Sequence, residues 1–141
     1  MFRNMTFTTI QKTPVMSVPY VPIPDSIITE LSKEQFGQAL LDNPGALVIK
    51  FGAEWCGPCK RIEPLVHSWM AQFPPTIQGA IIDIDENFEI YALLKSKKQV
   101  NGVPVILCYK KGNLTVIPDH VVVGADENQV NTFFQTVLTY A

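Results

Sequence analysis

Two cysteines separated by two residues are the groups in this sequence with the clearest chemical potential. Cys56 and Cys59 lie in segment 51–60, FGAEWCGPCK, which follows an apolar run and precedes a helical pattern. The N-terminus of a helix presents unpaired N–H groups and about half a positive charge, which favour a thiolate over a thiol. Across the first helical turn the two sulfurs can also approach to a disulfide bond length of about 2 Å. The pair therefore predicts dithiol–disulfide exchange.

The residues between the two cysteines suit such a site. Gly57 lets a substrate chain approach the backbone closely, and Pro58 fits a first helical turn because it has no N–H to leave unpaired. A free cysteine titrates near about 8.5, so stabilising the anion by a unit or two strongly increases the reactive fraction near neutral pH.

Three other uses of the pair stay open from the residues alone. A zinc or iron–sulfur site normally needs four ligands, and the only further cysteine and histidines are Cys108, His67 and His120, without regular spacing. We therefore predict no metal site. A structural staple across so short a loop removes little unfolded-chain entropy. The third alternative is an interaction module that keeps the pair without using it.

Composition and charge exclude several classes of function. The 141 residues suffice for one domain with a single core, and 47% apolar and 17% charged residues are ordinary for a globular protein. A net charge of -2 gives no bulk attraction to nucleic acid or an anionic membrane. No run approaches the roughly 18 apolar residues of a membrane span, and the N-terminus lacks the apolar core of a secretory signal. We expect a cytoplasmic monomer that binds neither nucleic acid nor membrane.

The first 25 residues differ from the rest of the chain. They contain four prolines within eleven positions, at 14, 19, 22 and 24, which remove backbone donors and favour an extended conformation. We interpret residues 1–25 as a proline-rich N-terminal arm and residues 26–141 as the folded domain.

From residue 26 onwards strand-like and helical patterns alternate. Strands are predicted over residues 26–31, 46–51, 79–84, 103–109 and 114–123, and helices over residues 32–41, 59–72, 87–98 and a stretch following Asp126. Ser32 with Gln35 resembles a capping box, and Pro64 should kink the second helix. A tight hairpin turn is expected at residues 110–113. The alternation predicts an α/β fold with helices on both faces of the sheet.

The chain resembles the thioredoxin family from residue 26 to residue 140. WCGPCK at residues 55–60 matches the active-site hexapeptide of that family, and Pro64 matches its kinking proline. The segment Asn101, Gly102, Val103 and Pro104 is similar to the loop whose cis-proline faces the disulfide in thioredoxins. A bare CxxC would be weak evidence, but this hexapeptide with Gly-x-Pro further along the chain is specific.

The resemblance implies a fold and a mechanism. The fold is a central mixed sheet of five strands, in the order 1-3-2-4-5, flanked by four helices. Cys56 attacks a substrate disulfide, and the more buried Cys59 resolves the mixed disulfide. The groove for an extended substrate chain would be lined by Trp55, Gly57, Pro58, Val103 and Pro104. The pair itself is the redox group, so no other cofactor is implied, and electrons would come from a flavoprotein of the thioredoxin-reductase type.

The sequence departs from the family at the position six residues before the first cysteine. Thioredoxins hold a buried aspartate there, whereas this chain has Lys50, and the family's partner lysine corresponds to Ile81. A charged lysine inside a strand needs a carboxylate, a lowered pKa or a route to water. Asp83 falls on the same sheet face as Ile81, so we expect a Lys50–Asp83 ion pair that tunes the thiols, with a solvent-directed Lys50 as the alternative.

The leading interpretation is therefore a thiol–disulfide oxidoreductase that acts on protein disulfides as a reductant. One alternative is a thioredoxin-fold binding or scaffold subunit without turnover. Another is a more oxidising oxidase or isomerase. The third cysteine, Cys108, lies in an apolar run and is expected in the core.

Overall fold

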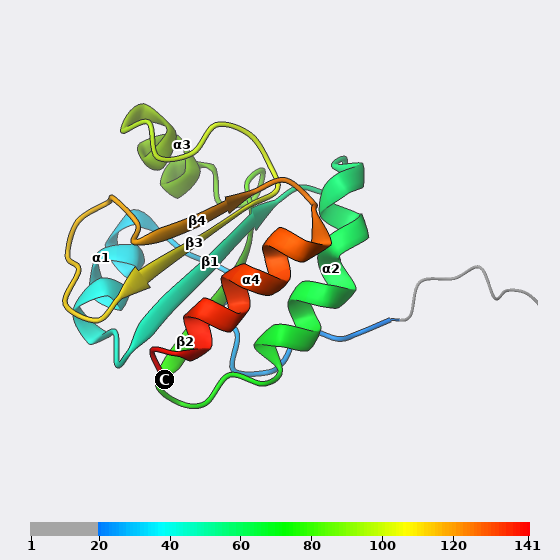
Figure 1. Cartoon of the computed structure of the whole chain (residues 1–141). Helices are drawn as coiled ribbons and strands as arrows, with labels where there is room; N and C mark the ends of the chain where they lie inside the picture. Colours follow the sequence, from blue (N-terminus) through cyan, green and yellow to red (C-terminus); the bar gives the residue numbers. More distant parts are fainter. Residues whose placement is uncertain (1–19) are drawn as a thin grey trace, which may run out of the picture.

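Residues 20–141 are described by the computed structural model, so most of the predicted arm lies outside the described residues. The elements follow one another as α1 (Lys33–Asp42), β1 (Ala46–Gly52), α2 (Gly57–Met70), β2 (Ile77–Asp83), α3 (Phe88–Ser96), β3 (Val105–Lys110), β4 (His120–Val123) and α4 (Glu127–Leu138). Figure 1 shows one sheet with helices packed against both of its faces. The α/β class and the four predicted helices are confirmed.

The sheet has four strands in the order β2-β1-β3-β4. β1 pairs in parallel with β2 and antiparallel with β3, which pairs antiparallel with β4. The central β1 is buried along its whole length, as its unbroken apolar run predicts. Parallel pairing of β1 and β2 brings their carboxyl ends to the same edge of the sheet, where α2 begins.

The prediction of a first strand over residues 26–31 is wrong. Only Ile28 pairs with the sheet, in an isolated parallel bridge to Ala80. Its N–H donates to the Gly79 carbonyl at 3.0 Å. The backbone N–H of Leu31 instead donates to the Asn87 side chain at 2.9 Å. Because only the two backbone bonds of Ile28 join this segment to β2 in a ladder, the predicted five-stranded order loses its first member.

The last hairpin also differs from expectation. β4 begins at His120, six residues later than predicted. The chain does turn at residues 110–113, where the Asn113 N–H donates to the Lys110 carbonyl at 3.0 Å, but this turn does not lead directly into β4. A longer loop connects the two strands, and it satisfies its own polar groups. The Asp119 carboxylate accepts from the Lys110 backbone N–H at 2.7 Å and from the Asn113 amide at 3.1 Å. These local bonds replace the ladder that a longer β4 would have made.

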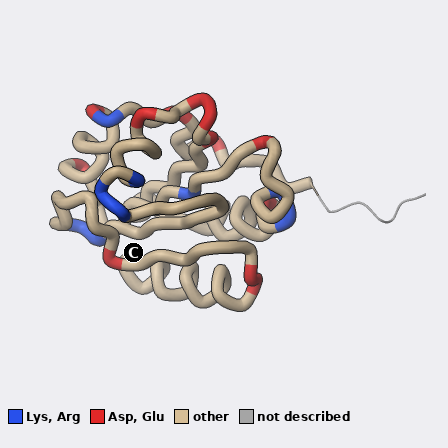
Figure 2. The backbone as a smooth tube through the Cα atoms, turned by 90° about the horizontal axis from the view of Figure 1, so that it is seen from above, with Lys and Arg blue, Asp and Glu red and all other residues tan. Residues whose placement is uncertain are grey.

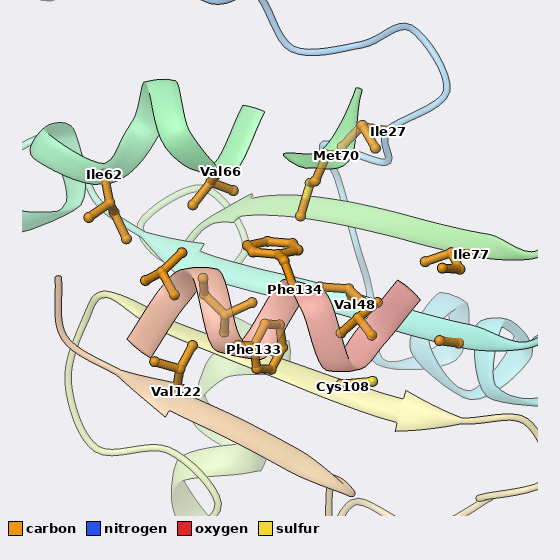
Figure 3. Packing of buried hydrophobic residues seen from close by; sticks show 14 residues of the cluster. Ile27, Val48, Ile62, Val66, Met70, Ile77, Cys108, Val122, Phe133 and Phe134 are labelled. Atoms are coloured by element: carbon orange, nitrogen blue, oxygen red, sulfur yellow. The ribbon is translucent and has the colours of Figure 1, made fainter. Parts of the chain in front are cut away.

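The core consists of two layers, one on each side of the sheet. α2 and α4 cover one face, where Ile62, Val66 and Met70 of α2 meet Val130, Phe133 and Phe134 of α4 (Figure 3). α1 and α3 cover the other face through Phe36, Leu40, Ile90 and Leu94. This packing fixes the axis of α2, and with it the position of the cysteine pair.

Capping fixes where the helices begin. Ser32 and Gln35 form the predicted capping box of α1, with the Ser32 Oγ accepting from the Gln35 N–H at 3.0 Å. Asp126 caps α4 as predicted. Over residues 20–141 none of the helices combines the length and the apolar character needed to cross a membrane.

Candidate functional site

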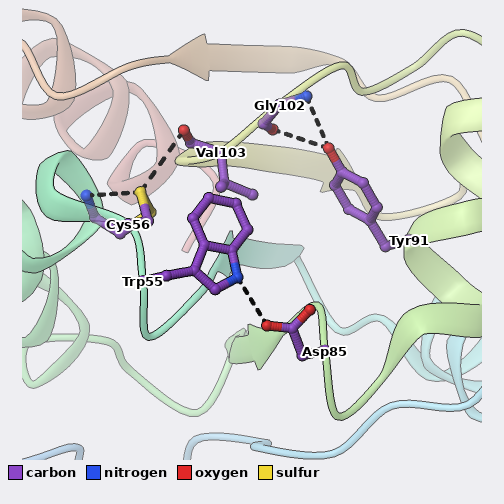
Figure 4. The surroundings of a disulfide bond; sticks show 7 residues. Trp55, Cys56, Asp85, Tyr91, Gly102 and Val103 are labelled. Atoms are coloured by element: carbon purple, nitrogen blue, oxygen red, sulfur yellow. Dashed lines mark hydrogen bonds between the residues drawn. A yellow bond between two sulfur atoms is a disulfide. The ribbon is translucent and has the colours of Figure 1, made fainter.

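The N-terminal end of α2 holds a disulfide between Cys56 and Cys59, with the two Cα atoms 5.2 Å apart. Cys56 is the N-cap of the helix, and its Sγ accepts a hydrogen bond from the Cys59 backbone N–H at 3.1 Å (Figure 4). Cys56 is 5% exposed and Cys59 only 1%. The pair therefore lies at a helix N-terminus, as predicted, although α2 begins at Gly57 rather than at residue 59, and Cys56 is nearer the surface.

The chain around the disulfide is held by short local bonds. The Cys56 N–H donates to the Ala53 carbonyl at 3.2 Å, and the Cys56 carbonyl accepts from the Lys60 N–H at 3.2 Å. Pro58 lies in the first turn, where no intrahelical donor is required. Gly57 and Pro58 are exposed, and among the described residues no atom beyond the adjoining chain and helix backbone lies within 4 Å of the place where a Gly57 side chain would begin. The flank of the disulfide is thus open to an approaching chain.

A loop before β3 lies against the first cysteine. The peptide bond between Val103 and Pro104 is cis, and the Val103 carbonyl is 3.8 Å from the Cys56 Sγ. Val103 is half-buried and Pro104 is buried. The Tyr91 hydroxyl accepts from the Gly102 N–H at 2.7 Å and donates to the Gly102 carbonyl at 3.1 Å, so α3 braces this loop. Tyr91 was not singled out from the sequence, because nothing in its helical spacing marks a contact with the loop.

Trp55 lies on the surface next to the disulfide. It is 68% exposed, which excludes a core position, and its Nε1 donates to the Asp85 Oδ2 at 2.9 Å. Asp85 is a site residue that the sequence reasoning missed. The signal was available, because residues that follow β2 lie at the same sheet edge as residues that follow β1. Figure 4 shows the indole between the disulfide and Asp85.

The expected Lys50–Asp83 ion pair is wrong. Within residues 20–141 the salt bridge found is Lys60–Glu54, at 2.9 Å on the surface. The Asp83 Oδ1 instead accepts from the backbone N–H groups of Asp85 and Glu86, at 2.8 and 3.1 Å. The turn after β2 thus engages the carboxylate that was expected to pair with Lys50.

The alternative of a solvent-directed Lys50 is wrong as well, since Lys50 is 2% exposed. Burial lowers the pKa of Lys50 below its ordinary value; the negative charge of Glu63 opposes that shift, and the positive charge of Lys60 adds to it. Its ammonium end lies near the disulfide: a methyl group placed on Gly52 would be 3.5 Å from the Lys50 Nζ and 3.6 Å from the Cys59 Cβ.

A pocket of about 390 Å³ reaches Lys50 from the surface. Its wall includes three residues that precede the domain pattern, Tyr20, Val21 and Ile23. The charged residues along it are Lys50, Lys60, Glu54, Glu63, Asp83 and Glu86. Figure 2 shows charges of both signs spread over the molecule rather than a single-sign surface, in keeping with a net charge of -2.

Neither histidine is placed for chemistry at the disulfide. His67 is buried, and its Nδ1 lies 2.6 Å from the Val21 carbonyl, to which it donates. His120 contacts the Tyr140 hydroxyl at 2.5 Å, on β4. Over the described part of the chain no three His, Cys, Asp or Glu side chains gather as metal ligands would.

These contacts together define what the site can do. An exposed tryptophan, an open first helical turn and a loop carbonyl surround a cysteine that caps a helix. A thiolate at such a position receives a backbone N–H and the positive end of the helix dipole. The arrangement suits reversible thiol–disulfide exchange with a chain lying across the Val103 loop.

Comparisons with known proteins agree with this geometry. A family model described as Thioredoxin matches residues 27–136. Thioredoxin of Pseudomonas aeruginosa is 30% identical over 87 residues, which are 62% of this chain and 77% of that protein. Mitochondrial thioredoxin of Mus musculus is 28% identical over 103 residues, and the match spans only 58% of that protein. Among solved structures, a Plasmodium falciparum thioredoxin has a TM-score of 0.62 and 25% identity, covering 81% of this chain and 100% of that one.

Proposed function

The chain belongs to the thioredoxin family, whose members are thiol–disulfide oxidoreductases, and from this premise we propose that it reduces disulfides in protein substrates. Cys56 is the attacking thiol and Cys59 the resolving thiol. The observation that carries this proposal is the N-cap position of Cys56, whose Sγ accepts the Cys59 N–H at 3.1 Å. A resolving thiol needs proximity rather than access, and the lower exposure of Cys59 fits that role.

The reaction moves two electrons in two exchanges. The Cys56 thiolate attacks one sulfur of the substrate disulfide; a bond between Cys56 and the substrate forms, the substrate S–S bond breaks, and the released thiolate takes a proton from water. Cys59 then loses its proton and attacks the Cys56 Sγ. The Cys56–Cys59 bond forms, the mixed disulfide breaks, and the second substrate sulfur leaves as a thiolate that is protonated. The substrate gains both electrons, and the protein is left oxidised.

The substrate side of the proposal is an extended polypeptide. Trp55, Gly57 and Pro58 offer an open surface on one side of Cys56, and Val103 with Pro104 borders the other. A chain laid along the Val103 backbone can pair with it as an added strand, which recognises main chain rather than a particular sequence. A flavoprotein reductase of the thioredoxin-reductase type is the proposed electron donor, and a monomer in the cytoplasm the proposed setting.

Insulin reduction driven by dithiothreitol tests the proposal. Wild type should accelerate insulin precipitation, and Cys59→Ser should instead accumulate a mixed disulfide through Cys56 that gel electrophoresis without reductant detects. Cys108→Ala serves as the matched cysteine control and should retain wild-type activity. A wild-type protein that binds reduced and oxidised insulin alike without turnover would favour the scaffold alternative.

Lys50 favours one second candidate, a more oxidising exchange such as disulfide formation or isomerisation. When its amine is protonated, Lys50 places a positive charge beside the pair that stabilises thiolates, and a more stable reduced form makes a couple more oxidising. Equilibration of the pair with glutathione distinguishes the two directions. A reduction potential in the range of protein disulfide isomerases would assign this chain to oxidation.

A further inference from the structure

Neither sulfur-exchange step above uses Lys50 as a proton donor or acceptor, although its amine lies behind the disulfide. It is 2% exposed, and within residues 20–141 no carboxylate forms an ion pair with it. Burying an unpaired ammonium group costs several kcal/mol, so such a group is retained against a clear penalty. Lys50 lines the pocket of about 390 Å³ and belongs to neither apolar layer of the core.

The reduced Cys59 thiol lies where the loss of its proton is unfavourable. It is 1% exposed and packs with Ala53, Ile84 and Val103, all apolar. When reduced, it must lose a proton before it can attack the Cys56 sulfur, and an apolar environment opposes the formation of a thiolate. A proton acceptor therefore has to lie on the inner side of the helix end.

Several of the other titratable groups along the pocket are engaged elsewhere. The Glu54 carboxylate binds Lys60 at 2.9 Å, and the Asp83 carboxylate binds two backbone N–H groups. His67 donates to the Val21 carbonyl. The groups that face Lys50 across the pocket are Lys60, Glu63 and His67 of α2, Glu54, Asp83, Glu86 and Tyr20. Of the carboxylates, Glu63 and Glu86 have no side-chain hydrogen bond or ion pair within the described residues, and Glu63, whose negative charge acts on Lys50, is the rival acceptor.

The geometry connects Lys50 to Cys59 through Gly52. The Lys50 Nζ and the Cys59 Cβ border one small volume, at 3.5 and 3.6 Å from the position of a Gly52 methyl group. No direct hydrogen bond is needed, because proton transfer through one bridging water is sufficient. A water occupies about 30 Å³ of liquid volume, and the pocket has room for several.

We propose that the Lys50 amine and the Cys59 thiol share one proton through this pocket, so that Lys50 accepts the Cys59 proton in the resolving step. The inference rests on the proposed dithiol–disulfide exchange. In the step, the proton leaves the Cys59 Sγ for the Lys50 Nζ, the Cys59 thiolate attacks the Cys56 Sγ, and the substrate thiolate leaves. Lys50 then returns its proton to water along the pocket. Burial lowers the pKa of the Lys50 amine, which is the direction that a base at this position requires.

The test isolates the resolving step with a small aromatic disulfide, 5,5′-dithiobis(2-nitrobenzoate). Its first thiolate is released when Cys56 is modified and its second when Cys59 resolves, so stopped-flow absorbance gives two phases. The second phase is measured against pH for wild type, Lys50→Met and Glu63→Gln. Lys50→Met should move its pH midpoint upward by at least one unit and slow it about tenfold or more at pH 7. Glu63→Gln should keep the wild-type midpoint.

Two further variants separate proton transfer from charge alone. Lys50→Arg keeps the positive charge but cannot act as a base near neutral pH, so it should resemble Lys50→Met. Gly52→Ala keeps Lys50 and places a methyl group, at ordinary contact distances, in the volume that both groups border. It should slow the second phase and leave the first unchanged. The proposal is overturned if the second phase of Lys50→Met keeps the wild-type pH midpoint, or if the second phase of Lys50→Arg has the wild-type rate. A shifted pH midpoint in Glu63→Gln would overturn it as well.

A measurement on the wild-type protein covers the case in which the Lys50 variants do not fold. The Lys50 Cε chemical shift is followed against pH by NMR, once with the disulfide intact and once reduced. Because a shared proton couples the two groups, Lys50 should titrate differently in the two states. Identical curves would contradict the proposal. The aromatic disulfide tests the resolving step without a protein substrate. If insulin is not reduced but the second phase still depends on Lys50, only the proposed function is overturned.

Discussion

Cys56 and Cys108 have almost the same exposure and opposite surroundings. Cys56 is 5% exposed at the N-cap of α2, and Cys108 is 0% exposed in the middle of β3. The Cys56 sulfur accepts a backbone N–H, whereas the Cys108 side chain packs in the apolar layer between the sheet and α4 (Figure 3). Burial raises the pKa of the Cys108 thiol to about 12, with the negative charge of Asp119 adding to the shift.

The comparison shows that a small exposed area does not by itself make a cysteine inert. What differs is the polar environment of the sulfur: a helix N-terminus stabilises an anion, and a sheet interior opposes one. If that environment decides reactivity, the two cysteines should respond differently to the same chemical change.

Replacing the sulfur of each cysteine should separate the two regions most strongly. Cys56→Ser should lower insulin reduction by at least about 10³-fold, because the thiolate that we propose as the attacking group is lost. Cys108→Ser should stay within about twofold per folded molecule, because Cys108 takes no part in the exchange. The measurement is initial rate corrected for folded fraction by circular dichroism. A strong loss of activity per folded molecule in Cys108→Ser would contradict the difference between the two cysteines.

Alkylation of the reduced, folded protein should show the same order. At pH 7 iodoacetamide should modify Cys56 at least about 10³ times faster than Cys108, because alkylation requires the thiolate. Peptide mass spectrometry of a time course gives both rates. Denaturant should remove the difference, since it abolishes both the helix N-terminus and the sheet interior. Rapid labelling of Cys108 in the folded state would contradict its assignment to the core.

Alkaline pH should destabilise the oxidised protein through Cys108. The pKa of Cys108 is about 12 when folded and near about 8.5 when unfolded. Its contribution is fully present below pH 8.5, and it is lost at up to about 1.4 kcal/mol per pH unit as the pH rises towards 12. Between pH 8.5 and 10 the unfolding free energy of Cys108→Ala should therefore fall less than that of wild type, by about 2 kcal/mol. Urea titrations at each pH measure the unfolding free energy of both proteins. If it changes equally with pH in wild type and in Cys108→Ala, the raised pKa of Cys108 is contradicted.

Two substitutions at Cys108 sharpen what its surroundings require. Cys108→Ala removes one buried atom, whereas Cys108→Ser keeps the shape but adds a hydroxyl in an apolar layer. The hydroxyl should cost about 1–3 kcal/mol of unfolding free energy, more than the alanine cavity. Thermal or urea unfolding at pH 7 checks the order. A serine variant as stable as alanine would mean that the site accepts a polar group.

Trp55 should give the smallest effect, because it borders the reacting sulfur without taking part in the exchange. Trp55→Ala should raise the KM for insulin about three- to tenfold and leave kcat within about twofold. Asp85→Asn is the matched control, since it keeps the indole while weakening its anchor at 2.9 Å. A fall in kcat alone would assign Trp55 to thiol chemistry rather than to substrate contact.

The predictable part of this protein lies in local patterns. The motif WCGPCK predicts a cysteine at a helix N-terminus, because Pro58 suits the first helical turn and a helical spacing of apolar residues follows it. The capping box at Ser32 and the cap at Asp126 fixed two helix starts for the same reason, as each depends on residues within one turn. Unbroken apolar runs identified β1 and β3 as buried strands.

Where contacts between distant segments decide, the sequence was not sufficient. The apolar run at residues 26–31 resembles a strand, yet only Ile28 pairs, because Leu31 binds Asn87 across the fold. Asp83 has the right face for Lys50, but its carboxylate binds the turn that follows it. Tyr91 and Asp85 reach the site only because α3 and the end of β2 lie beside it. Periodicity and local propensity carry no information on which of several available partners a polar group will choose; packing of the whole chain decides that.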